Sequence, residues 1–160
     1  MTDYADIRLL VMDVDGVMTD GKVTYTSDGQ ELKSFNIKDG LGIKRAQASG
    51  IETAIITGRT SAMVERRALE LGIAHLIQGR EDKLTALLDL LEQMGLSLDQ
   101  VAYIGDDLPD LMAIESVKLG ACPADADIEV QSKANWVSTR VGGDGCIREL
   151  CDLLVSHKSS

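Results

Sequence analysis

The chain has 160 residues, a length typical of one domain covering residues 1–160, and 44% of them are hydrophobic while 26% are charged. Its 16 basic and 26 acidic side chains give a formal net charge of −10, which argues against nonspecific binding to nucleic acid or to an anionic membrane. No apolar run approaches the roughly 18–20 residues of a membrane-spanning helix. The three cysteines, an odd number without a Cys-x-x-Cys pair, indicate reduced thiols in the cytoplasm.

Short apolar runs of strand length alternate with stretches of helical periodicity along most of the chain. We expect strands at residues 7–12, 52–57, 74–77, 101–105, 117–121 and 135–138, and helices at 41–49, 61–71, 83–94, 108–115 and 146–155. Gly50, Gly72 and Gly95 end three of these helices, where positive φ is favoured. The alternation predicts an α/β fold with a mostly parallel central sheet and helices on both faces. Residues 157–160 are expected to be disordered.

Residues 17–36 interrupt the alternation. Two β-prone runs, 22–26 and 31–35, flank the turn residues 27–30, which predicts a β-hairpin inserted after the first strand. The hairpin is either a decoration on the sheet edge or a part of the functional site, and both interpretations remain open at this point. A second irregular segment, Gly142-Gly143-Asp144-Gly145, is either a phosphate-binding nest or a flexible loop that contacts a neighbouring molecule.

Two carboxylates come directly after the first expected strand, in the segment Asp13-Val14-Asp15-Gly16-Val17. Ligands of α/β sheets bind beyond the carboxyl ends of the strands, and side chains two residues apart face the same side of an extended segment. Carboxylates this close repel each other, so either Asp13 or Asp15 needs a proton or a cation. The plainer alternative is a polar turn that ends the strand.

A second acidic group, Gly105-Asp106-Asp107-x-x-Asp110, follows another expected strand, so we expect it at the same edge of the sheet. Each like-charged pair at 4 Å costs about 4 kcal/mol at an effective dielectric constant of 20. Mg²⁺ removes this penalty and prefers the oxygen ligands that carboxylates, water and a phosphate provide, so the acids predict a magnesium site. The alternative is a helix N-cap followed by acids of the first turn.

Thr57-Gly58-Arg59 ends the second strand of the alternation, and Lys83 begins a helix. A hydroxyl and free backbone N–H groups at a helix N-terminus suit a phosphate oxygen. Taken alone, however, Thr57 is better explained as a simple N-cap, and Lys83 as a solvated surface charge.

The order of these motifs resembles that of the haloacid dehalogenase superfamily of phosphohydrolases, whose fold is Rossmann-like. The resemblance implies that Asp13 attacks phosphorus and forms an aspartyl-phosphate, with Asp15 as the general acid for the leaving alcohol and then the general base for water. It also implies that Thr57 and Lys83 bind the phosphoryl group, that Lys83 offsets charge around Asp13, and that Gly58 belongs to the substrate-binding residues. Mg²⁺ is then bound by Asp13, Asp106 and the backbone carbonyl of Asp15, and Asp107 supports the site either through water or by orienting Lys83.

Many members of that superfamily insert a cap domain, for which this chain has no room beyond the hairpin. A bare site admits bulk water, so we expect the hairpin of a neighbouring subunit to cover it. This architecture is similar to the cap-less, tetrameric phosphatases of 3-deoxy-D-manno-octulosonate 8-phosphate (KDO8P), and the local matches are residues 13–21, 35–40, 56–59 and 142–145.

The second resemblance implies a cytoplasmic, Mg²⁺-dependent homotetramer that releases KDO and phosphate from a small sugar phosphate in lipopolysaccharide synthesis, with neither nucleic acid nor membrane as a partner. Related phosphatases of the nine-carbon KDN 9-phosphate tend to carry Glu where this chain has Arg59, so Arg59 favours the eight-carbon substrate. Arg59 and Arg67 are expected to pair with a substrate carboxylate, although a solvated helix charge also explains Arg67. KDN 9-phosphate or another sugar phosphate is the alternative substrate.

A non-enzymatic alternative is a phospho-accepting receiver module, which also combines acids after the first strand with Thr, Lys and Mg²⁺. Those modules place the accepting Asp after the third strand, whereas no Asp follows residues 74–77 here before Asp82. They also lack the hairpin and a Gly-Asp-Asp segment after the fourth strand. The sequence therefore favours the hydrolase.

Overall fold

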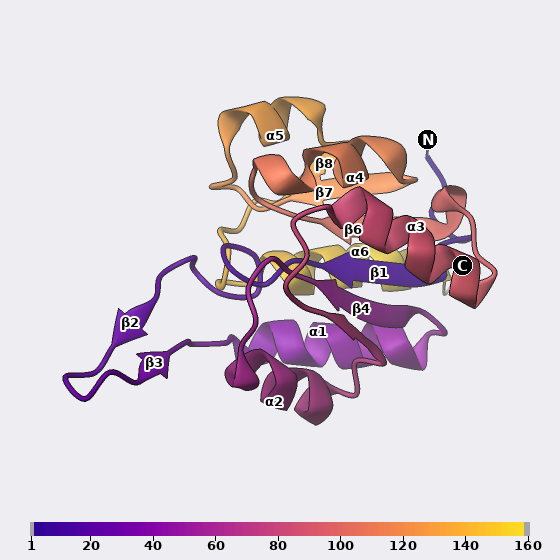
Figure 1. The fold of residues 1–160 in the computed structure, drawn as a ribbon. Coiled ribbons are helices and arrows are strands. Elements are labelled where there is room, and N and C mark those ends of the chain that lie inside the picture. The colour runs from indigo at the N-terminus through magenta and orange to yellow at the C-terminus, as the bar shows by residue number, and fades with distance from the viewer. Residues whose placement is uncertain (1, 159–160) are drawn as a thin grey trace.

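The structure, a computed structural model, describes residues 2–158. Its centre is a parallel sheet of six strands in the order β5-β4-β1-β6-β7-β8 (Figure 1). The strands are β1 (Leu9–Met12), β4 (Glu52–Ile56), β5 (His75–Ile77), β6 (Val101–Ile104), β7 (Leu119–Cys122) and β8 (Trp136–Val137). The predicted α/β class with a parallel sheet is confirmed.

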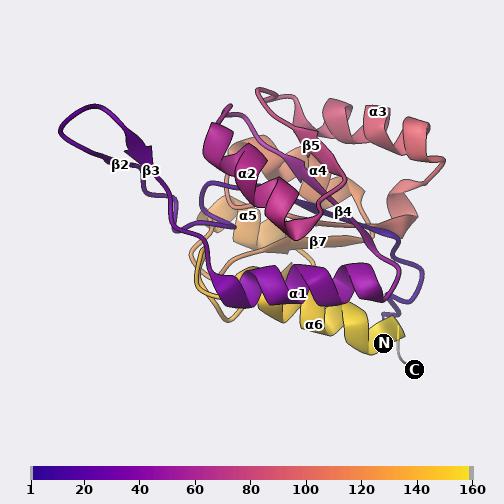
Figure 2. The same cartoon turned by 90° about the horizontal axis from the view of Figure 1, so that it is seen from below.

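Helices cover both faces of the sheet (Figure 2). On one face pack α1 (Ile37–Ala48), α2 (Ala62–Leu71) and α6 (Cys146–Lys158), and on the other α3 (Lys83–Met94), α4 (Leu111–Ser116) and α5 (Ile128–Lys133). Leu10 and Met12 of β1 point to the first layer, while Leu9 and Val11 point to the second. A strand covered on both faces needs apolar side chains at every position, which explains the continuous apolar run. No helix within residues 2–158 combines the length and apolar character needed to cross a bilayer.

The strand order creates a crevice at the carboxyl ends of two central strands. From β1 the chain passes to β4 and then to the edge strand β5, and it returns to place β6 on the other side of β1. Where the connections after two neighbouring parallel strands lead to opposite sides of the sheet, the loops that follow the strands separate, and ligands bind in the gap between them. Here the gap lies between the ends of β1 and β6.

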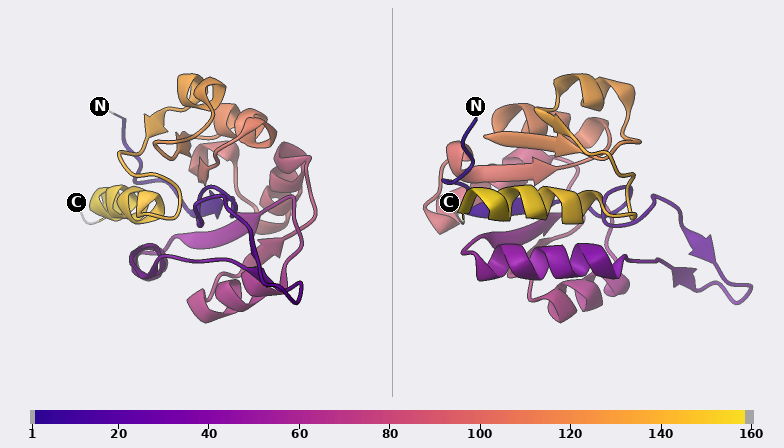
Figure 3. Two further views of the ribbon diagram at one scale, coloured as in Figure 1. Left: turned by 90° about the vertical axis from the view of Figure 1, so that its left-hand side faces the viewer. Right: turned by 180° about the vertical axis from the view of Figure 1, so that it is seen from behind.

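The predicted hairpin is present and extends away from the sheet (Figure 1, Figure 3). It consists of β2 (Thr24–Tyr25) and β3 (Glu31–Leu32), which are antiparallel and shorter than the two β-prone runs. Tyr25 and Leu32 are 65% and 51% exposed, so this arm packs little apolar surface against its own chain. Between residues 2 and 158 no separate cap unit accompanies it, as expected.

Four local predictions need correction. Helix α1 begins at Ile37 instead of residue 41, because the Asn36 side chain accepts a hydrogen bond from the Lys38 N–H at 2.8 Å and caps it. Helix α5 was not predicted; its six residues are too few for a periodic pattern. Strand β7 is displaced from residues 117–121 to 119–122, because helix α4 continues to Ser116.

The fourth correction concerns the C-terminus, where α6 continues to Lys158 and includes residues 157 and 158, which were expected to be disordered. The ring of Tyr4 packs edge-on against His157 with 5.1 Å between centroids, and the Tyr4 N–H donates to His157 Nδ1 at 3.2 Å. These contacts with the N-terminal segment hold the last turn. Residues 159–160, for which disorder was also expected, lie outside the described residues. Two 3₁₀ turns, η1 (Leu98–Gln100) and η2 (Leu108–Asp110), precede β6 and α4.

Candidate active site

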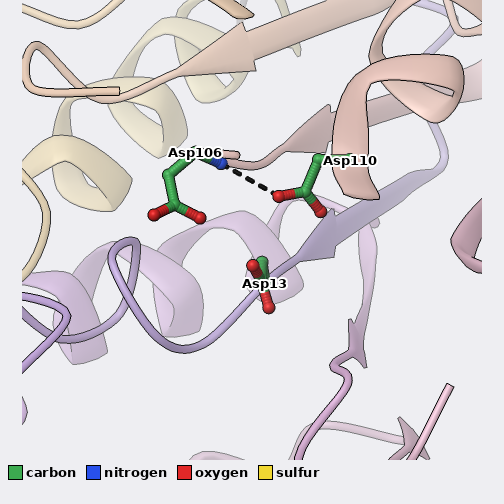
Figure 4. Close-up of side chains that lie close together, drawn as sticks. All are labelled: Asp13, Asp106 and Asp110. Atoms are coloured by element: carbon green, nitrogen blue, oxygen red, sulfur yellow. Dashed lines mark hydrogen bonds between the residues drawn. The ribbon is translucent and has the colours of Figure 1, made fainter. Parts of the chain in front are cut away.

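Acidic residues from two strand ends meet in the crevice. Met12 and Ile104 are partners in the parallel ladder, and the Asp13 N–H donates to the Ile104 carbonyl at 3.1 Å. The loops that follow β1 and β6 therefore begin side by side at the carboxyl edge of the sheet. Carboxylate oxygens of Asp13, Asp106 and Asp110 all lie within 4.8 Å of one another (Figure 4). The predicted gathering of acids at one edge of the sheet is confirmed.

Asp110 organises the loop that carries the other acids. It is fully buried, and its Oδ2 accepts from the N–H groups of Asp106 at 3.0 Å and Asp107 at 3.3 Å. Its Oδ1 accepts from the Tyr103 hydroxyl at 2.7 Å and from Lys83 at 2.8 Å. Both oxygens are thus already engaged by four donors. Asp110 therefore fixes the turn after β6 and is poorly placed to coordinate a cation directly.

Gly16 leaves room for Asp106. Its φ is +88°, a conformation that L side chains rarely adopt, and a Cβ here would lie 1.9 Å from Asp106 Oδ2. The glycine of the Asp13-Val14-Asp15-Gly16 segment is therefore required both by the turn and by the close approach of the opposite carboxylate.

Lys83 is the buried cation among the acids and stands at the first position of α3. Its Nζ lies 3.0 Å from Asp13 Oδ2 and 2.8 Å from Asp110 Oδ1. The alternative interpretation of Lys83 as a solvated surface charge is therefore wrong. A buried ammonium needs charged partners, and two acids supply them.

The acids outnumber the cation, and the ionisation equilibria reflect this. Burial raises the pKa of Asp13 well above its usual value, and the Asp110 carboxylate adds to that effect. Burial and Asp110 together raise the pKa of Asp106 to about 7. Burial alone would lower the pKa of Lys83, but the charges of Asp13 and Asp110 outweigh it and raise that pKa. The site thus holds an excess of negative charge that a divalent cation would relieve.

The donor set fits a hard cation. Asp13 and Asp106 present carboxylate oxygens to the same point, and this ligand chemistry is the one that Mg²⁺ prefers. The third acid of the cluster is Asp110, whereas the resemblance assigned the third contact to the backbone carbonyl of Asp15. Each oxygen of Asp110 already accepts two hydrogen bonds, whereas Asp13 Oδ1 accepts one from Val14 and Asp13 Oδ2 faces Lys83. Within this cluster, Asp13 and Asp106 therefore keep acceptor capacity for a metal ion.

A cleft of about 290 Å³ opens above the acids and brings most of the predicted residues together. Its lining includes Asp13, Asp15, Thr57, Gly58, Arg59, Lys83, Asp106 and Asp107. Thr57 directly follows β4 and is buried, and its N–H donates to the Ile77 carbonyl at 2.9 Å. The backbone of Thr57 is therefore held at the edge of the cleft.

Two predicted residues take less central positions. The Asp107 side chain accepts from the Leu108 N–H at 2.8 Å and caps η2, while Asp110 and not Asp107 orients Lys83. Arg67 does not line the cleft of its own chain: it stacks over the Phe35 ring at 5.6 Å and donates to the Asn36 carbonyl at 3.4 Å. Arg67 is thus connected to the base of the hairpin.

The glycine-rich segment 142–145 supports the loop after β1. The Gly143 N–H donates to the Val17 carbonyl at 3.0 Å, and a Cβ on Gly142 would lie 1.9 Å from the Gly16 carbonyl oxygen. Gly142 and Gly143 therefore serve as a backbone-to-backbone contact within the chain, a role that neither interpretation of this segment anticipated.

Sequence reasoning missed one charged contact of the site. Lys33, the residue after β3, forms an ion pair with Asp15, and its side chain is fully enclosed. Its neighbour Glu31 lies 3.0 Å from Arg59. An alternating run such as Glu31-Leu32-Lys33 on a hairpin reads as a solvated face, and no local signal connects it with a residue 18 positions earlier.

Comparisons with known proteins agree with this geometry. The haloacid dehalogenase-like hydrolase family matches residues 72–150. A Salmonella typhi protein named 3-deoxy-D-manno-octulosonate 8-phosphate phosphatase is 48% identical over 155 residues, which cover 97% of this chain and 82% of that protein.

Two solved structures extend the likeness to three dimensions. The KDO8P phosphatase of Moraxella catarrhalis, in complex with a magnesium ion, a phosphate ion and KDO, superposes with a TM-score of 0.96 at 46% identity, covering 98% of this chain and 90% of that one. The cobalt-bound enzyme of Haemophilus influenzae gives a TM-score of 0.94 at 38% identity, covering 99% and 92%. The chain therefore belongs to the KDO8P phosphatase family of haloacid dehalogenase-like hydrolases.

Proposed function

We propose that the chain is a phosphomonoesterase that uses Mg²⁺ to hydrolyse KDO8P to KDO and phosphate. The observation that carries this proposal is the meeting of Asp13, Asp106 and Lys83 in the cleft between β1 and β6. The relatives named above support the substrate, and the Moraxella catarrhalis complex supports the metal.

Asp13 is the nucleophile of this proposal. Its Oδ1 accepts from the Val14 N–H at 2.7 Å and its Oδ2 faces Lys83, so the carboxylate has a fixed direction. Lys83 and Thr57 bind the phosphoryl oxygens. Asp13 and Asp106, with the backbone carbonyl of Asp15, would hold Mg²⁺, which would supply positive charge against the acids and the phosphoryl group. Repulsion between Asp13 and an anionic phosphate, which would otherwise oppose attack, is thereby offset.

Asp15 carries the proton. As Asp13 forms a bond to phosphorus, the bond to the sugar oxygen breaks, and that oxygen takes the proton of Asp15. Water then attacks the aspartyl-phosphate and gives a proton to Asp15, while the phosphate leaves Asp13. Asp15 is protonated again at the end, and Asp13 is free. Partial exposure of Asp15 in the cleft fits this exchange with a leaving alcohol and with water.

Arg59 is the candidate for recognition of the substrate carboxylate. It lies at the rim of the cleft, half exposed, with Glu31 as its present partner. Arg67 remains a second candidate for the same carboxylate, at the base of the hairpin.

Assembly completes the site in this proposal. The exposed Tyr25 and Leu32 on an arm that leaves its own chain suit a homotetramer in which the hairpin of one subunit covers the cleft of another. The three cysteines are buried and unpaired, which fits a reducing cytoplasm, where KDO release would serve lipopolysaccharide synthesis. Light scattering should give the mass of four chains; full activity in a monomer would overturn the shared cover.

Phosphate release from KDO8P, KDN 9-phosphate and hexose 6-phosphates, with Mg²⁺ or with excess EDTA, tests the function. We expect kcat/KM to be highest for KDO8P and release to stop in EDTA. A higher kcat/KM for KDN 9-phosphate would assign the nine-carbon substrate instead, and Mg²⁺-independent release would refute the metal.

A further inference from the structure

Four side chains of alternating charge form a closed ring between the hairpin and the cleft. Lys33 Nζ pairs with Asp15 Oδ1 and lies 3.8 Å from Glu31 Oε1. Arg59 Nη2 lies 3.0 Å from the same Glu31 oxygen, and Arg59 Nε lies 4.0 Å from Asp15 Oδ2. We call Asp15, Lys33, Glu31 and Arg59 the charge ring. Two members come from the stem of the hairpin and two from the ends of β1 and β4.

Lys33 is the unusual member of the charge ring. Its side chain is 0% exposed, although it belongs to an arm on the surface, whereas Asp15 keeps 25% of its side chain exposed. A lysine is enclosed in this way only when a partner compensates for its lost hydration. Lys33 does not line the cleft, so it contacts Asp15 and not the space where a substrate binds.

The contact constrains which oxygen of Asp15 performs proton transfer. A carboxyl group has two oxygens, and a general acid must present the protonated one to the leaving oxygen at hydrogen-bond distance. Lys33 occupies Oδ1, whereas the other cation paired with Asp15 among residues 2–158 is Arg59, whose Nε at 4.0 Å from Oδ2 is beyond hydrogen-bond reach. Oδ2 is therefore the oxygen left to carry the proton, and the side chain is prevented from turning Oδ1 into the cleft.

We propose that Lys33 is a positioning residue for the reaction: it holds the Asp15 carboxyl so that Oδ2 meets the leaving-group oxygen. This rests on the proposed role of Asp15 as the general acid. Because Lys33 follows β3 directly, this ion pair connects the stem of the hairpin with the orientation of Asp15. The hairpin then contributes to catalysis within its own chain.

The test compares two aryl esters of nearly the same shape, 4-nitrophenyl phosphate and phenyl phosphate. Phenoxide is the poorer leaving group and depends more on the general acid. The constant kcat/KM reports the steps up to phosphoryl transfer, so Asp15's later role as a base does not enter. In Lys33→Met we expect the ratio of the two kcat/KM values, nitrophenyl over phenyl, to rise about tenfold, and kcat/KM for KDO8P to fall about 10- to 100-fold.

Lys22→Met is the matched control, since Lys22 is an exposed lysine at the start of the same arm. It should leave both quantities unchanged, and Lys33→Arg should restore much of the loss, because a guanidinium also donates to Oδ1. If Lys33→Met does not fold, Lys33→Gln removes the charge at similar length. Light scattering of each variant checks that its mass equals that of the wild type.

A wild-type kcat/KM for KDO8P would overturn the positioning role. An unchanged ratio between the two aryl esters would overturn it too, even if kcat/KM falls equally on both, since a merely structural effect does not depend on the leaving group. The proposed function fails separately: a wild-type protein that does not release phosphate from KDO8P refutes the substrate, while a raised ratio in Lys33→Met still supports the role of Lys33.

Discussion

Single side chains determine the chemistry through their charges. Asp13 and Asp106 were predicted as site residues because each follows a strand end, and parallel strands bring those ends together. Lys83 was expected in the site only from the resemblance. Asp110 was expected in the acidic group, but its role in fixing the turn after β6 was not predictable, and neither was the contact of Lys33 with Asp15. Asp110 acts by accepting four hydrogen bonds, and Lys33 acts through a residue on another element; neither contact leaves a pattern in the sequence.

Asp13→Asn should lower kcat at least about 10⁴-fold, since an amide is a poor nucleophile and no other carboxylate occupies its place. The fold should survive, because burial and the nearby Asp110 carboxylate both disfavour the charged form of Asp13, and a neutral amide avoids this cost. The melting temperature of the Mg²⁺-free variant at pH 8 should equal or exceed that of the wild type. Phosphate release and circular dichroism measure the two effects. A kcat within tenfold of the wild type would exclude Asp13 as the nucleophile.

Mg²⁺ binding should strengthen with pH. The pKa of Asp106 is about 7 in the folded chain against 3.8 in an ordinary aspartate, so between these values the folded state holds a proton that the unfolded state has lost. The free energy of unfolding of the Mg²⁺-free protein should therefore fall as pH rises from about 4 to 7.

Because Mg²⁺ binds the deprotonated acid, the rise in melting temperature that it causes should be small at pH 5.5 and large at pH 8. Thermal denaturation with and without Mg²⁺ measures this. In Asp106→Asn the rise should be much reduced at both pH values. A Mg²⁺ effect independent of pH in the wild type would contradict the assigned pKa.

Among the elements, clear periodicity and turn residues made most of them predictable. Helix α3 begins and ends where its periodicity indicates, at Lys83 and Met94, because an amphipathic stripe over 12 residues leaves little choice. Helix α5 is too short for a periodic pattern, and the hairpin was predicted but its strands are shorter than the β-prone runs, because tertiary contacts decide these details. The contact between loop 142–145 and the loop after β1 was not predicted for the same reason, since it depends on a close approach between residues distant in sequence.

Gly142→Ala tests that approach. The new Cβ would meet the Gly16 carbonyl oxygen, a backbone atom that cannot move alone, so the loop after β1 must shift. We expect a loss of stability of about 1–3 kcal/mol and a reduced kcat, because Asp15 and Gly16 move with the loop.

Gly95→Ala is the matched control: φ there is +69° but nothing lies within 4 Å, so the substitution strains only its own backbone. Its melting temperature should fall while kcat stays unchanged. Thermal denaturation and phosphate release measure both variants, and a wild-type kcat in Gly142→Ala would show that the contact does not support the site.

For the molecule as a whole, strand order connects sequence with function. A chain that builds its sheet outward from β1 in both directions leaves one crevice at β1 and β6, and the acids of the two loops meet there. The alternation of strands and helices predicted the parallel sheet, but the strand order itself came from the structure. The hairpin projects away from this sheet. The sequence suggests that another subunit covers the site only because the chain has no room for a cap domain.

Oxygen exchange between inorganic phosphate and water tests the central claim most directly. With Mg²⁺ and phosphate labelled with oxygen-18, and no sugar present, Asp13 should attack phosphorus and expel labelled water, and ordinary water should then restore phosphate. We expect the wild type to deplete the label steadily, as read by mass spectrometry, and Asp13→Asn to leave it intact. A protein that hydrolyses KDO8P yet never exchanges the phosphate oxygens would contradict a covalent intermediate on Asp13.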